Sequence, residues 1–127
     1  MTREQKLFKA LIKADLKLVI ENYQDSDKAI RLQAAYHMQQ AVEKTIKLKA
    51  GSEGLNLWGH EIDVLIKKCD DYNIEIGIPK LIRDKADVIS HWKAECRYYP
   101  VTVVRKDSIK KVYDVTLEWL ESGNTKK

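Results

Sequence analysis

The chain has few residues that interrupt a helix and no segment that suits a membrane. Its 127 residues include only two prolines and five glycines, the residue types that most disfavour helix interiors. No run of about eighteen apolar residues occurs, which excludes an ordinary membrane-spanning helix. The segment from Met1 to Lys6 lacks the apolar stretch of a secretory signal. We therefore expect a cytoplasmic protein that makes no membrane contact.

Motifs for metal binding, redox chemistry or standard enzyme classes are also missing. Cys69 and Cys96 have no Cys-x-x-Cys spacing, so we interpret them as reduced thiols without a metal or redox role. The sequence contains no glycine-rich phosphate loop and no His-Glu-x-x-His zinc helix. It also lacks a Gly-x-Ser-x-Gly nucleophile motif. We therefore expect no cofactor and no metal, and the standard templates identify no catalytic residue.

The composition is typical of one small helical domain. A chain of this length, with 44% hydrophobic and 33% charged residues, forms one hydrophobic core. We therefore expect a single domain over residues 1–127, with residues 122–127 as a flexible tail. The net charge of +4 permits a polyanionic partner without identifying one.

Apolar periodicity predicts helices over most of the chain. In the first, a broad apolar face contains Leu7, Leu11, Ala14 and Leu18, with Phe8, Ile12 and Val19 beside them. The expected helices span residues 4–23, about 27–51, 61–69, 79–97 and about 108–122, with an ordered loop at 70–78. Asp25 or Ser26 is the expected N-cap of the second, a glycine in 51–54 its C-cap, and Asp107 or Ser108 the cap of the last. These elements predict an all-α, antiparallel up-and-down bundle of four to five helices.

The second expected helix carries an unusual set of polar residues. Its apolar stripe consists of Leu32, Ala35, Met38, Val42 and Ile46. Beside that stripe, two turns carry Tyr36, His37, Gln39, Gln40, Glu43 and Lys44. Packing alone gives little reason to prefer these residues, because a buried Gln or Glu needs hydrogen-bond partners.

This helix resembles the signature helix of the HEPN (higher eukaryotes and prokaryotes nucleotide-binding) domain family. The resemblance rests on the run Tyr-His-Met-Gln-Gln-Ala-Val-Glu-Lys-x-x-Lys at residues 36–47. The steps Gly-His-Glu-Ile at 59–62 and Arg-Tyr-Tyr-Pro at 97–100 fall where the family usually has a Gly-His-Asp/Glu step and an Arg-Tyr-Pro-like step. Helices are predicted on both sides of these steps, so the resemblance covers nearly the whole chain. The resemblance implies the same helical bundle and favours a homodimer over a monomer.

A ligand pocket between the second and fourth expected helices is one interpretation of these residues. Lys44 and Arg97 would hold phosphates, a tyrosine would stack on a base, and Gln40 or His60 would supply hydrogen bonds. The candidate ligand-binding residues are Tyr36, Gln40, Lys44, His60, Arg97 and Tyr98.

A structural interpretation of the same residues stays open. His60 caps a helix or reaches back to Glu43, and Arg97 pairs with Glu43 or with the last carbonyls of its helix. The polar face would then form a dimer seam, where aromatic and Arg residues are also enriched.

The resemblance also implies a test for catalysis. Many members of the HEPN superfamily are metal-independent ribonucleases, with an Arg followed four to six residues later by a His. No histidine follows Arg97 here, since His91 is the last one. Arg31 and His37 have the spacing, but six helical positions place them about 120° apart. The standard nuclease motif is therefore absent.

Three functions follow as hypotheses. The first is a non-catalytic HEPN module that binds a nucleotide or RNA, partners a separate small nucleotidyltransferase, or does both. The second is a ribonuclease toxin of a toxin–antitoxin pair, with a displaced site built from His37, Glu43, His60 and Arg97. The third is a structural dimerising adaptor.

Overall fold

The protein is an all-helical bundle. The computed structural model describes residues 1–98 and 103–123, with side chains for residues 1–93 and 103–123. These residues form six helices and no strand. The helices are α1 (Arg3–Asn22), α2 (Lys28–Ser52), α3 (Ile62–Asp71), α4 (Lys80–Asp84), α5 (Ala86–Tyr98) and α6 (Lys106–Glu121). The predicted all-α class is confirmed. The expected tail lies mostly outside the described residues.

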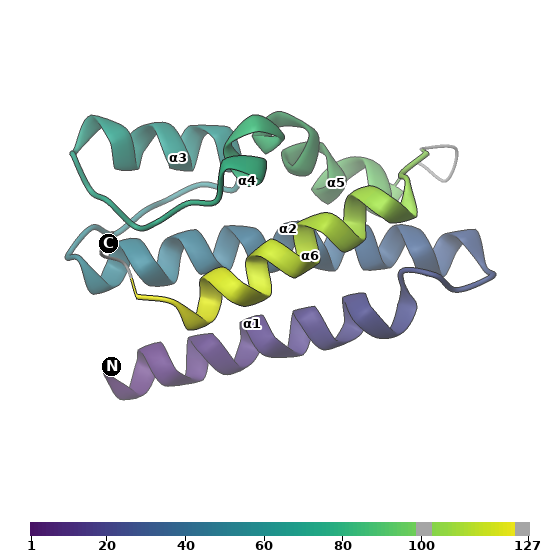
Figure 1. The fold of residues 1–127 in the computed structure, drawn as a ribbon, viewed down its shortest axis with the longest axis horizontal. Coiled ribbons are helices and arrows are strands. Elements are labelled where there is room, and N and C mark those ends of the chain that lie inside the picture. The colour runs from purple at the N-terminus through teal and green to yellow at the C-terminus, as the bar shows by residue number, and fades with distance from the viewer. Residues whose placement is uncertain (99–102, 124–127) are drawn as a thin grey trace.

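Helix α2 is the centre of the bundle. Figure 1 shows α1 running antiparallel along one side of α2, α3 to α5 on the other side, and α6 crossing the front. From residue 38 to residue 50, the side chains of α2 are buried except Gln40, Lys44 and Lys47, which are half-buried. None of the described helices is long and apolar enough to cross a membrane.

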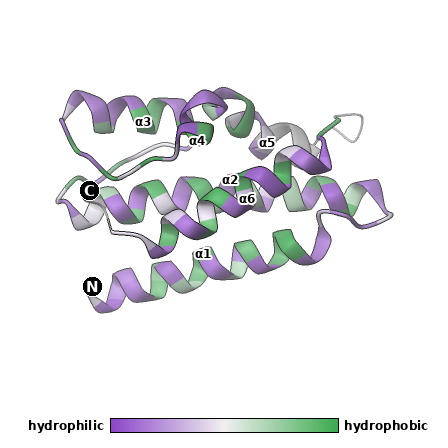
Figure 2. Cartoon of the chain, viewed as in Figure 1, coloured by the Kyte–Doolittle hydropathy of each residue, from purple (hydrophilic) through white to green (hydrophobic). Residues whose placement is uncertain are grey.

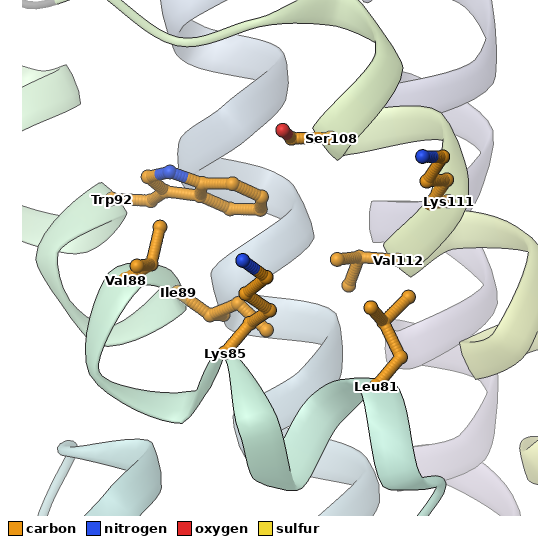
Figure 3. A pocket seen from close by; sticks show the side chains of 8 residues that line it. All are labelled: Leu81, Lys85, Val88, Ile89, Trp92, Ser108, Lys111 and Val112. Atoms are coloured by element: carbon orange, nitrogen blue, oxygen red, sulfur yellow. The ribbon is translucent and has the colours of Figure 1, made fainter.

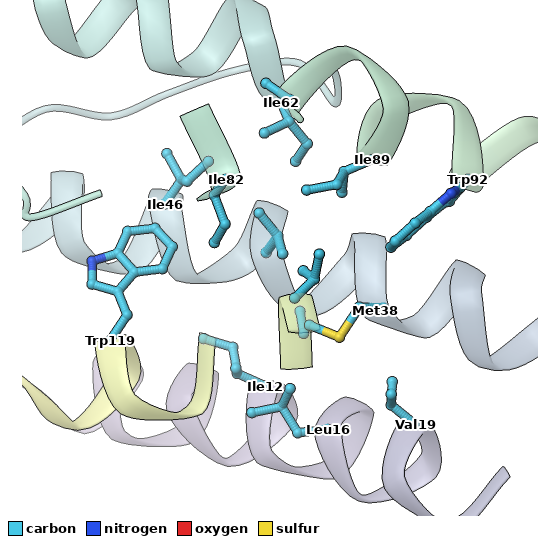
Figure 4. Packing of buried hydrophobic residues seen from close by; sticks show 14 of the residues in the cluster. Ile12, Leu16, Val19, Met38, Ile46, Ile62, Ile82, Ile89, Trp92 and Trp119 are labelled. Carbon is cyan, nitrogen blue, oxygen red and sulfur yellow. The ribbon is translucent and has the colours of Figure 1, made fainter. Parts of the chain in front are cut away.

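The core is built from the facing stripes of these helices. Ile12, Leu16 and Val19 of α1 and Met38 of α2 are almost fully enclosed. Figure 4 shows them packed in one cluster with side chains of α3 to α6, including Trp119. Figure 2 shows hydrophilic and hydrophobic residues alternating around the outer helices, as amphipathic helices require.

The ends of α2 follow standard capping chemistry, with shifted positions. The N-cap is Asp27, not the predicted Asp25 or Ser26, and its carboxylate accepts from the Ala29 amide at 2.8 Å. At the other end, Gly54 has φ +87° and its amide donates to the carbonyl of Gly51 at 3.0 Å. The Leu55 amide donates to the carbonyl of Ala50 at 2.9 Å, which completes a Schellman motif. The predicted glycine cap is therefore present, at Gly54.

The fourth predicted helix is in fact two. It breaks at Lys85, so that the short α4 lies out of line with α5 and packs against both α5 and α6 (Figure 1). Neither proline nor glycine stands at the break, so the residue types do not reveal it. The last helix begins at Lys106, which places Asp107 and Ser108 inside it instead of at its cap.

The apolar face predicted for α1 is only partly buried. Ile12 and Val19 are enclosed, but Leu7, Leu11 and Leu18 are 58%, 54% and 41% exposed. The exposed side chains recur at steps of four and seven residues, and they therefore form one stripe along the outside of α1. We call Leu7, Leu11 and Leu18 the outer stripe.

Candidate functional site

Two buried carboxylates organise the polar residues around α2. Asp15 projects from α1 and Glu43 from α2, and both are buried. The Glu43 cluster comprises Glu43, Gln39, Lys47, His60 and Lys93, and the Asp15 cluster comprises Asp15, His37 and Lys44.

The Glu43 cluster joins three parts of the chain. One carboxylate oxygen of Glu43 accepts from Nδ1 of His60 and from Nζ of Lys47, both at 2.9 Å. The other oxygen accepts from Nε2 of Gln39 at 3.1 Å and lies 3.8 Å from Nζ of Lys93. Gln39 also donates to the carbonyl of His60 at 3.1 Å. The loop before α3 is thereby fixed against α2, and α5 is joined to both.

Glu43 is ionised at neutral pH, and this sets the orientation of His60. Burial raises the pKa of Glu43, but the hydrogen bonds from His60, Lys47 and Gln39 together outweigh it and hold the pKa below the ordinary value of 4.5. An ionised carboxylate only accepts hydrogen bonds, so Nδ1 of His60 carries the proton that it donates. The His60 side chain is 64% exposed. Its Nε2 is therefore the ring atom available to a ligand.

A surface hollow lies beside the Glu43 cluster. It has a volume of about 400 Å³, and its lining includes His60 and Lys93 together with Ser90 and His91 of α5. Ser90 fixes one wall, because its hydroxyl accepts from the Ile62 amide at 2.7 Å at the start of α3. The lining also includes three carboxylates, Glu61, Asp63 and Asp87. Two of the lining residues, His60 and Lys93, face the carboxylate of Glu43.

The Asp15 cluster lies on the α1 side of α2. Asp15 accepts from Nζ of Lys44 at 2.8 Å and from Nδ1 of His37 at 3.1 Å. Burial raises the pKa of Asp15, but the hydrogen bonds from His37 and Lys44 outweigh it, so the pKa lies below its ordinary value. The Tyr36 ring meets the His37 ring edge-on, with centroids 5.2 Å apart. His37 also lines a second hollow of about 360 Å³ with Leu18.

The predicted ligand-binding residues are divided between the two clusters. Lys44 and Tyr36 belong to the Asp15 side, whereas His60 lies on Glu43. Gln40 is linked to the Glu43 cluster, because its Nε2 donates to Oε1 of Gln39 at 2.7 Å. Of the two contacts considered for His60, the one with Glu43 is present.

Other predicted residues do not meet, or lie outside the described side chains. Arg97 and Tyr98 belong to the backbone of α5, and their side chains lie outside the described part of the structure. Arg31 donates to the carbonyls of Asp25 and Ser26 in the loop before α2, whereas His37 pairs with Asp15. The Arg31 and His37 side chains thus have different partners.

Sequence reasoning missed Asp15 and Lys93. The signal for Asp15 was available, because it is a charged residue between Ile12, Leu16 and Val19 on the buried face of α1. Lys93 gave no comparable signal. Among the described residues, no group of three or more His, Cys, Asp or Glu side chains is placed to hold a metal ion.

Comparison with known proteins agrees with this architecture. The model of the HEPN domain family matches residues 7–123. The fold is similar to the crystal structure of TT1696 from Thermus thermophilus, with a TM-score of 0.69, 17% identity and 94% of each chain covered. At this identity the similarity shows the fold alone. A comparison with curated proteins gives no match. With the family model matched over nearly its whole length, the chain belongs to the HEPN domain family.

Proposed function

We propose that the Glu43 cluster binds a phosphate group of a nucleotide or of RNA, and that the protein acts as a non-catalytic HEPN module. The observation that supports this function is the placement of Lys47, Lys93 and His60 around one buried carboxylate, with His60 and Lys93 also lining the hollow beside it. Within the Glu43 cluster itself, apart from the three carboxylates of the hollow, two ammonium groups and one carboxylate leave one positive charge before His60 is counted. That excess suits an anion.

The preorganisation of these cations adds to the argument. The Lys47 and Lys93 side chains are only 22% and 26% exposed, and their ammonium groups lie 2.9 Å and 3.8 Å from the Glu43 carboxylate. Fixed donors lose less side-chain entropy when a ligand binds than mobile surface lysines do. The cluster would therefore bind a phosphate better than the same charges would on an ordinary surface helix.

Lys44 offers a second phosphate contact, about one turn of α2 away from Lys47. Lys44 and Lys47 are three residues apart on α2 and both are half-buried on its open side. Side chains at this spacing have Cβ atoms about 5–6 Å apart. A diphosphate or an RNA backbone running along α2 would then contact both clusters, with Gln40 between them.

Calorimetry with a matched variant tests the proposal. ATP, GTP and a short RNA are titrated into the wild type, Lys47→Gln and Lys67→Gln. Lys67 is a suitable control because it too pairs with a carboxylate four positions away on its own helix, that of Asp71 on α3. Loss of one charge-assisted hydrogen bond is worth about 1.5–3 kcal/mol, so Lys47→Gln should weaken binding by about 10- to 100-fold.

The control and the fold decide the outcome. Lys67→Gln should bind like the wild type, and circular dichroism should show both variants folded. No binding by the folded wild type, or equal losses in the two variants, would contradict the proposal. A specific loss in Lys47→Gln would assign the site to the Glu43 cluster.

A ribonuclease with a non-standard site is the second candidate. The orientation of His60 favours it, since Glu43 holds Nδ1 and leaves Nε2 exposed, as a general acid–base requires. RNA would be incubated with chelator present. Cleavage that His60→Ala abolishes, while RNA binding persists, would support this candidate. Absence of cleavage by the wild type leaves the binding function.

The outer stripe supports a separate proposal about assembly. Three exposed leucines along one helix form an apolar surface of the kind that protein interfaces cover. We propose a second copy of the chain as its occupant, in line with the homodimer that the family resemblance implies. A separate nucleotidyltransferase is the partner that pull-down experiments would seek next.

A further inference from the structure

A different cavity lies between the α4–α5 segment and α6. Its volume is about 210 Å³, and its walls are apolar side chains of Leu81, Val88, Ile89, Trp92 and Val112. Figure 3 shows these side chains arranged around it, with α4 and α5 on one side and α6 on the other. None of its lining residues belongs to the Glu43 cluster, the Asp15 cluster or the hollow beside His60.

Three polar side chains complete the lining. They are Lys85, Lys111 and the hydroxyl-bearing Ser108 (Figure 3). Within the described part of the chain, neither ammonium group lies within 4.0 Å of a carboxylate. The residues four positions further on are Ile89 and Val115, which carry no charge, although Asp107 lies four positions before Lys111. Other lysines do pair with an acid at that spacing: Lys17, Lys67, Lys80 and Lys110.

We propose that this cavity binds a small planar organic acid, such as an aromatic carboxylate. An apolar cavity of about 150 Å³ holds a benzene molecule, so the cavity here has room for one ring and a carboxylate. The ring would lie against the Trp92 indole and the aliphatic wall. The carboxylate would accept from Lys85, Lys111 and the Ser108 hydroxyl.

The size of the cavity excludes a whole nucleotide, and its two lysines favour an acid over a neutral hydrocarbon. Pockets for drug-sized ligands begin at about 300 Å³, so this cavity is too small for a whole nucleotide. A neutral hydrocarbon would contact the apolar walls but would gain nothing from the ammonium groups of the exposed Lys85 and Lys111. The cavity therefore takes a different ligand class from the Glu43 cluster, and the two proposals fail independently.

Nuclear magnetic resonance of the full chain with benzoate as the probe tests this site. Benzoate should cause saturable shifts of the backbone amides of Val88, Ile89 and Val112. Benzamide has nearly the same shape without the charge, and it should bind about tenfold more weakly or worse. Shifts that never saturate at these amides, or equal affinities for the two probes, would overturn the proposal.

Two double variants distinguish a specific role of Lys85 and Lys111 from a nonspecific effect of the protein's net charge. Lys85→Gln with Lys111→Gln should reduce benzoate affinity by about tenfold or more and leave benzamide affinity unchanged. Lys80→Gln with Lys110→Gln removes the same charge from neighbouring positions that do not line the cavity. Unchanged benzoate binding is expected there, and an equal loss in both double variants would refute a specific site.

Discussion

Replacing Glu43 by glutamine should destabilise the protein through the loss of one buried charge. Glutamine has nearly the same shape, but its amide nitrogen cannot accept the hydrogen bonds that one carboxylate oxygen receives from His60 and Lys47, and it carries no charge to attract Lys93. The substitution therefore leaves the packing in place. It removes the interaction between one buried anion and its cationic partners.

The size of the effect follows from the exposure of the partners. Breaking a fully buried ion pair costs about 3–5 kcal/mol, whereas an exposed pair is worth about 0–1 kcal/mol. Glu43 itself is buried, but Lys47 and Lys93 are about one quarter exposed and His60 is 64% exposed, so all three can regain water. The expected loss of unfolding free energy for Glu43→Gln at pH 7 is about 2 kcal/mol.

The pH dependence supplies the sharper test. The pKa of Glu43 is lower in the folded protein than its ordinary value of 4.5, so the ionised form is favoured by folding. Its stabilising contribution is complete above that value and is lost as the pH falls through the folded-state pKa. The stability difference between wild type and Glu43→Gln should therefore be largest at neutral pH and shrink below pH 4.5.

Urea unfolding followed by circular dichroism, at pH 7 and in steps below pH 4.5, measures both quantities. Glu118→Gln is the matched control, because Glu118 is exposed on α6 and makes no ion pair with the described residues. It should change stability by less than about 0.5 kcal/mol. A difference for Glu43→Gln that stays constant with pH, or that is absent at pH 7, would refute the electrostatic account.

Three further predictions concern the packing of α6 and the outer stripe. The buried hydroxyl of Thr116 has no hydrogen-bond partner within the described chain, so Thr116→Val should leave the unfolding free energy unchanged or raise it by up to about 1 kcal/mol in urea unfolding. Trp119→Phe should lower it by about 1–3 kcal/mol in the same assay, because the indole donates to the carbonyl of Ile76 at 2.9 Å and phenylalanine cannot. Leu11→Gln should shift sedimentation towards monomer without lowering the stability of the monomer. Leu117→Gln on α6 is the control and should sediment like the wild type. Equal sedimentation of both variants and the wild type would exclude the outer stripe as the interface.

The parts of the fold that depend on local periodicity were predictable. The lengths of α1 and α2 and the Gly54 cap follow from residue types within a few positions. The break at Lys85 was not predictable, because α4 turns to pack against α6, and no local residue type marks that contact. The half-exposed face of α1 has a similar cause. Its apolar stripe is wider than the neighbouring helices can cover, and in the sequence such a stripe looks the same as a fully buried one.

The candidate site was predictable in residue type but not in grouping. The polar residues of α2 that the sequence singles out do belong to the two clusters, and the contact of His60 with Glu43 is one of the two arrangements considered for His60. The division into two clusters depends on Asp15, which meets Lys44 across 29 positions of sequence. Such a long-range pair leaves no periodic signal.

The two clusters contribute more to the position of cations than to stability. Buried ion pairs often stabilise no more than apolar residues of the same volume would, because both charges must leave water. The partners of Glu43 remain partly exposed, which lowers the stabilisation further. A purely structural α2 would therefore gain little from this arrangement over an apolar one. What Glu43 does provide is a fixed place for two ammonium groups and a fixed ring orientation for His60, and a bound phosphate would use both.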